Sequence, residues 1–144
     1  EAPHDSRDNI VGRPGKHTRV AGDTRDLVRG NRGDDAIDGG AGRDNIVGGF
    51  GGDRLYGGDQ ADKILGGPGD DGINGGKGRD VIKAGRGDDL IVARDGQRDV
   101  ISCGKGEDKV RADYRDRVAR DCEVVRRAAP TPPPETETET GTNS

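Results

Sequence analysis

The sequence predicts an all-β solenoid with two nonapeptide blocks in each coil, and three observations lead to this class. First, only 24 of the 144 residues are Leu, Ile, Val or Phe, about 17%, while 36% are charged. Below roughly 20%, a chain normally cannot bury enough apolar surface to offset its conformational entropy, which excludes a helical bundle and a doubly wound sheet. Second, the chain repeats every nine residues. Third, its 27 glycines gather at fixed places in the repeat.

Ten consecutive blocks of nine residues fill residues 3–92 without an insertion. Position six of the block is aspartate in nine of the ten blocks, and position eight is Ile, Leu or Val in nine. The second block departs at both places, where it has His17 and Arg19. After residue 92 come a ten-residue unit, a nine-residue unit and a shortened unit, in which Asp99, Asp108 and Asp116 again stand two residues before an aliphatic residue. A regularity of this kind indicates a repeat architecture.

Each block is expected to form a turn and a strand of about three residues. Positions six to eight alternate inward, outward and inward, which is the period of a strand, and the glycines at positions one, two and four permit positive φ in the turn before it. Two blocks then make one coil, and the position-eight side chains meet as a thin core. The position-six aspartates should stack at about 4.8 Å in two columns. These columns are Asp26, Asp44, Asp62, Asp80 and Asp99, and Asp35, Asp53, Asp71, Asp89 and Asp108.

Carboxylates stacked this closely repel one another unless a cation lies among them. Carboxylate and carbonyl oxygens in a flexible turn suit Ca²⁺, which accepts six to eight such ligands at loose geometry. Zinc prefers nitrogen and sulfur, and the two histidines and two cysteines do not have the spacing of zinc ligands. An EF-hand pattern is absent from the sequence as well. The sequence therefore predicts calcium sites along both edges of the solenoid.

The blocks GGAGRDNIV and GGKGRDVIK resemble the nonapeptide Gly-Gly-x-Gly-x-Asp-x-(aliphatic)-x of the RTX, or haemolysin-type, calcium-binding repeats. This resemblance implies a right-handed parallel β-roll that holds roughly eight Ca²⁺ ions, each between adjacent turns on the same edge. It implies that the ten aspartates of the two columns are ligands, together with turn carbonyls. The implied carbonyl ligands are those of Gly40, Gly42, Gly49, Gly51, Gly58, Gly67, Gly69, Gly76, Gly78, Gly85 and Gly87.

The repeat also divides the chain. Residues 3–111 are predicted to form the calcium-binding β-roll, with degenerate repeats at 3–29, which lack most turn glycines, and regular repeats at 30–92. Residues 93–127 are expected to cap the last coil. Residues 128–144 form a Pro/Thr/Glu-rich tail, expected to be a solvated linker or stalk, or alternatively an added strand on a neighbouring edge.

Cys103 and Cys122 are the only cysteines, and both lie in the predicted cap. In a chain of secreted character such a pair favours a disulfide that closes a loop of about 20 residues; the alternative is two reduced thiols. The ending Cys-Gly-x-Gly-x-Asp … Asp-Cys-Glu also resembles the ends of secreted calcium-repeat proteins.

The charge and motif content favour a structural protein over an enzyme. The net charge of −4 points to neither nucleic acid nor a membrane surface, and no run of residues is apolar enough to span a membrane. No Ser/His/Asp or Cys/His set stands out from the repeat background, so no catalytic residue is predicted. We expect a calcium-binding structural module, secreted or at the cell surface. The alternatives are a subunit of a filament or surface layer, stacked end to end, and an accessory domain of a larger secreted enzyme.

The partners predicted are calcium ions, possible further copies of the chain, and acidic extracellular polysaccharide. The polysaccharide follows from charge, because eight bound Ca²⁺ ions would bring the net charge to about +12 and leave the 24 Lys and Arg side chains dominant at the surface.

Overall fold

The computed structural model describes residues 9–13, 15 and 18–128, which form fourteen short strands and no helix. One sheet contains the odd-numbered strands, β1 (Asn9–Val11), β3 (Leu27–Arg32), β5 (Asn45–Phe50), β7 (Lys63–Leu65), β9 (Val81–Arg86), β11 (Val100–Lys105) and β13 (Arg117–Val118). The other contains the even-numbered strands, β2 (Thr18–Val20), β4 (Ala36–Asp38), β6 (Arg54–Tyr56), β8 (Gly72–Asn74), β10 (Leu90–Ala93), β12 (Lys109–Ala112) and β14 (Val124–Arg127).

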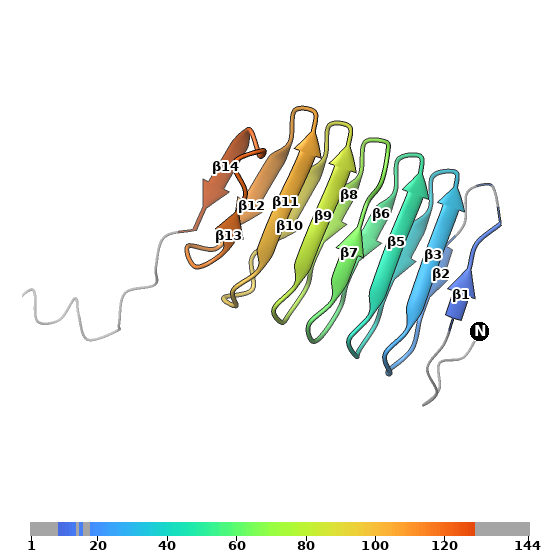
Figure 1. The fold of residues 1–144 in the computed structure, drawn as a ribbon. Helices are drawn as coiled ribbons and strands as arrows, with labels where there is room; N and C mark the ends of the chain where they lie inside the picture. Colours follow the sequence, from blue (N-terminus) through green and yellow to red (C-terminus); the bar gives the residue numbers. More distant parts are fainter. Residues whose placement is uncertain (1–8, 14, 16–17, 129–144) are drawn as a thin grey trace, which may run out of the picture.

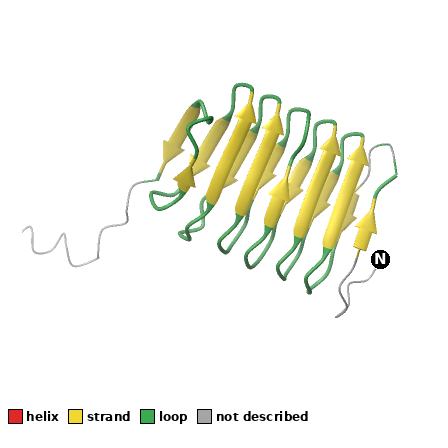
Figure 2. Cartoon of the chain, viewed as in Figure 1, coloured by secondary structure: helices red, strands yellow, loops and turns green. Residues whose placement is uncertain are grey.

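All strand pairs are parallel, and the chain alternates between the two sheets as it winds (Figures 1 and 2). Ile46 pairs with Ile64 and Leu55 pairs with Ile73, an offset of 18 residues in both sheets. The prediction of a parallel β-solenoid with two nonapeptide blocks per coil is thus confirmed. The offset grows to 19 between Val81 and Val100, where the ten-residue unit begins.

Four strands of the odd sheet are longer than predicted. The strands β3, β5, β9 and β11 have six residues, whereas β7 of the same sheet and β4, β6 and β8 of the even sheet have the predicted three. The longer strands continue into the following turn, where Gly85 pairs with Gly104 and Arg86 with Lys105. We call the turns that follow the odd strands edge I and the turns that follow the even strands edge II.

The core is one row of aliphatic side chains from each sheet, as the pattern at position eight predicts. Val28, Ile46, Ile64, Ile82 and Ile101 face Ile37, Leu55, Ile73, Ile91 and Val110, and every one is at most 3% exposed. Two large apolar side chains per coil are a small core, so the stability of the fold also depends on the strand ladders and on the polar chemistry of the edges.

At the C-terminal end β13 and β14 continue the two sheets, and a disulfide joins Cys103 to Cys122 with their Cα atoms 5.1 Å apart. The predicted disulfide is confirmed. The part of the chain that the structure describes contains no helix long and apolar enough to cross a membrane. The predictions for His17 and for residues 129–144 concern positions outside the described residues.

Candidate metal centre along the two turn edges

The ten predicted aspartates lie in two columns, one along each edge. Edge II brings together Asp26, Asp44, Asp62, Asp80 and Asp99, and edge I brings together Asp35, Asp53, Asp71, Asp89 and Asp108. Each is at the end of a turn, directly before a strand, and at most 3% of its surface is exposed. Charged side chains are almost never buried this completely without a partner, so the columns need a compensating charge or donor.

Within each column a hydrogen bond links every aspartate to the aspartate one coil earlier. The backbone N–H of Asp44 donates to Oδ1 of Asp62 at 2.8 Å, and on the other edge Asp53 donates to Asp71 at 2.8 Å. The same bond recurs at 2.7 to 2.8 Å along both columns from Asp26 to Asp99 and from Asp35 to Asp108. These bonds fix the orientation of each carboxylate.

The second carboxylate oxygen has no such partner in the regular coils. The Oδ2 atom is buried and accepts no hydrogen bond among the described residues in Asp44, Asp53, Asp62, Asp71, Asp80, Asp89, Asp99 and Asp108. A buried carboxylate oxygen without a hydrogen bond destabilises the fold, and here it recurs at eight equivalent positions. The recurrence indicates that a cation, and not a hydrogen-bond donor, is the partner of this oxygen.

Glycines at position one provide the space that such a partner would need. A Cβ atom on Gly39 would lie 2.8 Å from Oδ2 of Asp44 and 2.6 Å from the carbonyl oxygen of Gly57, in the next coil. On the other edge, a Cβ on Gly48 would lie 2.5 Å from Oδ2 of Asp53 and 2.8 Å from the carbonyl oxygen of Gly66. A carboxylate oxygen and a backbone carbonyl thus converge on one small gap, which is the hard-oxygen environment that Ca²⁺ prefers.

The predicted turn glycines have the backbone that this stacking requires. All eleven have positive φ, between +84° and +128°. A Cβ on Gly58 would collide with the carbonyl oxygen of Gly40, so the turns could not approach each other as closely with a larger residue. Asn31 and Gln60 stand at positions where other blocks have glycine, and they also have positive φ, +79° and +73°.

Without a cation, the pKa values of most of the position-six aspartates are raised, which favours their protonated form. Burial is the main cause and neighbouring carboxylates raise the pKa further, while the hydrogen bond from the preceding coil lowers it. From an ordinary value of 3.8, the pKa rises to about 8 for Asp62, Asp80 and Asp99, to about 7 for Asp44 and Asp71, and to about 6 for Asp53 and Asp89. A divalent ion between the turns would allow these groups to ionise at neutral pH.

Several groups at the site were missed from the sequence. The carbonyls of the position-one glycines beside Oδ2 were not among the predicted ligands, although the repeat itself marks them. Asp116 ends the edge II column, where its Oδ1 accepts the N–H of Asp99 at 2.9 Å, and its spacing in the repeat was a usable signal. Glu123 ends the edge I column by accepting the N–H of Asp108 at 2.9 Å. It lies 15 residues after Asp108, so the period of 18 gave no sign of it.

The first aspartate of edge II differs from those that follow. Oδ2 of Asp26 accepts the N–H of Gly22 at 3.0 Å, and its Oδ1 accepts the hydroxyl of Thr24 at 3.1 Å. This carboxylate therefore has donors in its own turn that the regular coils lack.

Stacked turns that bury one carboxylate each, on both edges of a parallel solenoid, define a calcium-binding β-roll. A comparison with protein families agrees, because the RTX calcium-binding nonapeptide repeat matches in four overlapping copies, at residues 20–55, 38–73, 47–82 and 65–98. Together the matches cover residues 20–98, which are 79 of the 144 residues. The chain belongs to this family, as the resemblance of its blocks predicted, and the repeats of the family bind Ca²⁺. No curated protein and no solved structure is significantly similar to the chain.

Proposed function

We propose that the chain is an extracellular structural module whose β-roll folds on binding Ca²⁺. The observation that carries the proposal is the buried Oδ2 atom that lacks a hydrogen-bond donor in eight successive position-six aspartates. An apolar core of two aliphatic side chains per coil does not offset stacked, buried carboxylates. The free energy of ion binding then becomes free energy of folding.

The residues proposed to hold the ions follow from the two columns. The carboxylates of Asp26, Asp35, Asp44, Asp53, Asp62, Asp71, Asp80, Asp89, Asp99 and Asp108 are the proposed acidic ligands. Turn carbonyls of positions two and four complete the set, and the position-one carbonyls are added to them because they face Oδ2. Bound calcium supplies positive charge between coils; the chain itself fixes each carboxylate through the bond to its Oδ1 and excludes water from its Oδ2. About eight ions are expected, with residues 3–111 as the roll and 93–127 as its cap.

The extracellular assignment rests on two features. The disulfide between Cys103 and Cys122 persists in an oxidising compartment, and RTX repeats are typical of secreted proteins. Alkylation of the native protein before and after reduction tests it. Two thiols that react without reduction would contradict both the bridge and the compartment.

A calcium titration followed by calorimetry and circular dichroism tests the proposed folding. We expect a largely disordered chain in chelator that gains β-structure with millimolar Ca²⁺, and no comparable gain with Mg²⁺, which demands a stricter octahedral geometry. An unchanged β spectrum in excess EGTA would overturn the proposal.

A second candidate is a subunit of a filament built by end-to-end stacking. The terminal strands β13 and β14 each pair with one strand only in the described chain, so each has an edge that could bind a further strand. Electron microscopy of the calcium-loaded protein tests this candidate, and monodisperse single rolls at high concentration would exclude it.

A further inference from the structure

The outer surfaces of the two edges carry opposite charges at position five, next to the buried aspartate. On edge I this position is mainly acidic and exposed, with Asp34, Asp70, Asp88 and Glu107. On edge II it is mainly arginine and exposed, with Arg25, Arg43, Arg79 and Arg98. The two edges thus bury the same carboxylate column but present different charges to solvent.

Two adjoining hollows lie along edge II near the C-terminal end. One, of about 250 Å³, is lined by Arg79, Gly96, Gln97, Arg98 and Arg115. The other, of about 390 Å³, is lined by Tyr56, Asn74, Gly76, Lys77, Arg94, Asp95 and Gln97. Gln97 lines both hollows, and we call the two together the edge trough.

The edge trough is strongly cationic. Five of its lining side chains are positive, and the one acidic side chain, Asp95, is already used within the protein. Its Oδ2 accepts the N–H of Gly78 at 2.7 Å and its Oδ1 accepts the N–H of Gln97 at 2.8 Å. The guanidinium of Arg98 is held toward Arg115 by a hydrogen bond from its Nε to the carbonyl oxygen of Arg115, at 3.3 Å. Several positive groups are therefore placed close together, and the trough suits a ligand with more than one negative charge.

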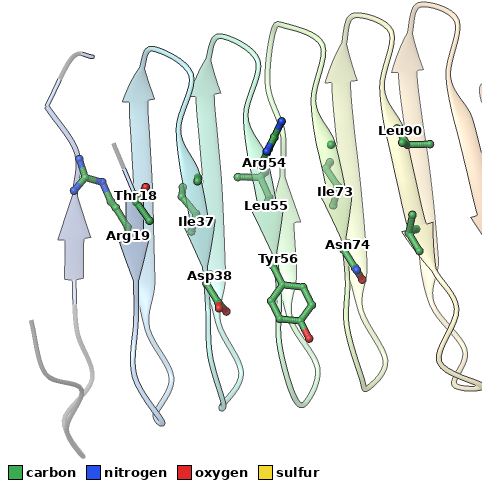
Figure 3. Close-up of a pocket in the computed structure, with 13 residues that line it drawn as sticks. Thr18, Arg19, Ile37, Asp38, Arg54, Leu55, Tyr56, Ile73, Asn74 and Leu90 are labelled. Carbon is green, nitrogen blue, oxygen red and sulfur yellow. The ribbon is translucent and has the colours of Figure 1, made fainter. Parts of the chain in front are cut away.

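Beside the trough lies a mainly apolar surface. Tyr56 and Asn74 line a third hollow, of about 560 Å³, on the outer face of the even-numbered sheet, which also includes Leu90 and Val92. Asp38, Tyr56 and Asn74 lie in one row across β4, β6 and β8. Figure 3 shows these three side chains among those that line the third hollow. Oδ1 of Asn74 accepts the N–H of Gly76 at 3.0 Å, which leaves its amino group to donate. An exposed aromatic ring, amide groups and arginines along one path match the apolar faces, hydroxyls and anions of an acidic sugar chain.

We propose that the edge trough is a binding site for an acidic polysaccharide, and that the calcium-loaded roll is the form that binds it. The inference rests on the proposed function, because the arginines at position five stand next to the carboxylates that the ions would neutralise. Without calcium the chain is expected to be largely disordered, so the side chains that line the trough would not be held together. Calcium would therefore control the shape of the site.

A nucleic acid fits the surface less well. Proteins that bind single strands stack successive bases on several aromatic side chains, whereas Tyr56 is the one aromatic side chain among the residues that line the trough. The amides of Asn74 and Gln97 suit hydroxyl groups, of which a sugar polymer has many. Nucleic acid is therefore kept as an outcome of the test.

Calorimetric titration of the whole chain in millimolar Ca²⁺ tests the proposal with four probes. These are a sulfated heparin hexasaccharide, a carboxylated oligogalacturonate of the same length, a neutral dextran oligosaccharide and an oligothymidine. We expect one or both acidic oligosaccharides to bind, the neutral one not to bind, and affinity to fall with added salt. The tighter of the two acidic probes identifies whether sulfate or carboxylate is the preferred anion. Tighter binding of the oligothymidine than of both acidic sugars would overturn the proposal.

Matched variants localise the site. The double variant Arg79→Gln/Arg98→Gln should lower the affinity roughly tenfold or more, since it removes two charge-assisted contacts. Tyr56→Ala should lower it as well. The control Arg29→Gln/Arg86→Gln removes the same charge from exposed positions outside the trough, and should leave the affinity within about twofold. Equal losses in the two double variants would reduce the effect to overall charge and contradict a defined site.

Loss of polysaccharide binding can be distinguished from loss of calcium-dependent folding. Circular dichroism and calcium stoichiometry of each variant are measured in the same samples. A chain that folds with calcium but binds no acidic oligosaccharide would overturn the edge trough alone. A chain that binds the oligosaccharide equally well in excess EGTA would contradict its calcium dependence.

Discussion

The regular coils and the C-terminal cap both place a carboxylate against the backbone of a neighbouring coil, but the two carboxylates have different hydrogen-bond partners. In the regular coils, Oδ2 of Asp62 is buried and accepts no hydrogen bond among the described residues. In the cap, Asp121 accepts the N–H groups of Cys103 and Gly104 at 3.1 and 2.9 Å and the hydroxyl of Ser102 at 3.2 Å. Burial alone would raise the pKa of Asp121, but these donors lower it below its usual value, whereas the pKa of Asp62 rises to about 8.

The difference follows from what each carboxylate faces. In the regular coils the gap beside Oδ2 is lined by a carbonyl oxygen of the following coil. Oδ2 of Asp44, for example, shares this gap with the carbonyl oxygen of Gly57, and both atoms are hydrogen-bond acceptors. In the cap, the carboxylate of Asp113 accepts the N–H of Asp95 at 2.8 Å and also that of Gly96, so backbone donors already satisfy it. A repeated turn that presents carbonyls needs a cation between coils. The cap instead closes the series with the chain's own donors.

Chelation should produce the largest effect and should separate the two regions. In excess EGTA at pH 8, the amides of Asp44, Asp62 and Asp80, which donate along the edge II column, should lose nearly all protection from hydrogen exchange, because their acceptors ionise and repel one another. The amide of Gly104 should lose less, since the disulfide keeps Asp121 near it. Exchange measured by NMR with and without calcium gives both values. Protection of Asp62 that survives chelation would refute a role for ions in the regular coils.

Replacing one interior aspartate should affect two ions. Asp62 is linked by hydrogen bonds to Asp44 on one side and Asp80 on the other, so Asp62→Ala should lower the calcium stoichiometry by about two. Asp108→Ala should lower it by at most one, because Asp108 is the last position-six aspartate of its column and only Glu123 follows it. Asp59→Ala removes an exposed carboxylate from the same turn and is the control. Calorimetric stoichiometry measures all three, and a loss of one ion at Asp62 would contradict ions shared between successive coils.

In chelator, the order of the regular coils should depend on pH in the opposite sense from ordinary acid denaturation. Burial raises the folded-state pKa of Asp62 and Asp80 to about 8 from 3.8, so the folded roll without metal binds more protons than the unfolded chain between these values. Stability of that form is therefore highest below about pH 4 and is lost as pH rises toward 8. Circular dichroism in EGTA should show more β-structure at pH 5 than at pH 8. With saturating calcium the trend should reverse, since protons compete with the ions.

The position-six and position-eight residues made most of the fold predictable. A strict period of nine fixes which side chain is inward, so the two columns and the paired rows of aliphatic side chains follow from Asp62 and Ile64 and their equivalents. The extension of β5 to six residues was not predictable, because it depends on backbone pairing between stacked turns such as those of Asn31 and Gly49. The cap was only partly predictable. Its offsets of 17 and 15 residues break the period, and the roles of Asp121 and Glu123 depend on contacts that only the folded chain creates.

The smallest expected effect concerns the cap carboxylate. Asp121→Asn keeps the shape of the side chain but removes the charge that the amides of Cys103 and Gly104 and the hydroxyl of Ser102 contact. The free energy of unfolding in saturating calcium should fall by roughly 1–3 kcal/mol, the usual cost of weakening hydrogen bonds to a charged acceptor. Calcium stoichiometry should stay the same, because the donors leave no role for an ion there and the two nearby sulfur atoms are joined in the disulfide. Glu107→Gln, an exposed carboxylate on the same edge, is the matched control and should change stability by no more than about 0.5 kcal/mol. Urea unfolding with parallel calorimetry measures both quantities, and the loss of an ion in Asp121→Asn would place a calcium site in the cap and remove the distinction between the two regions.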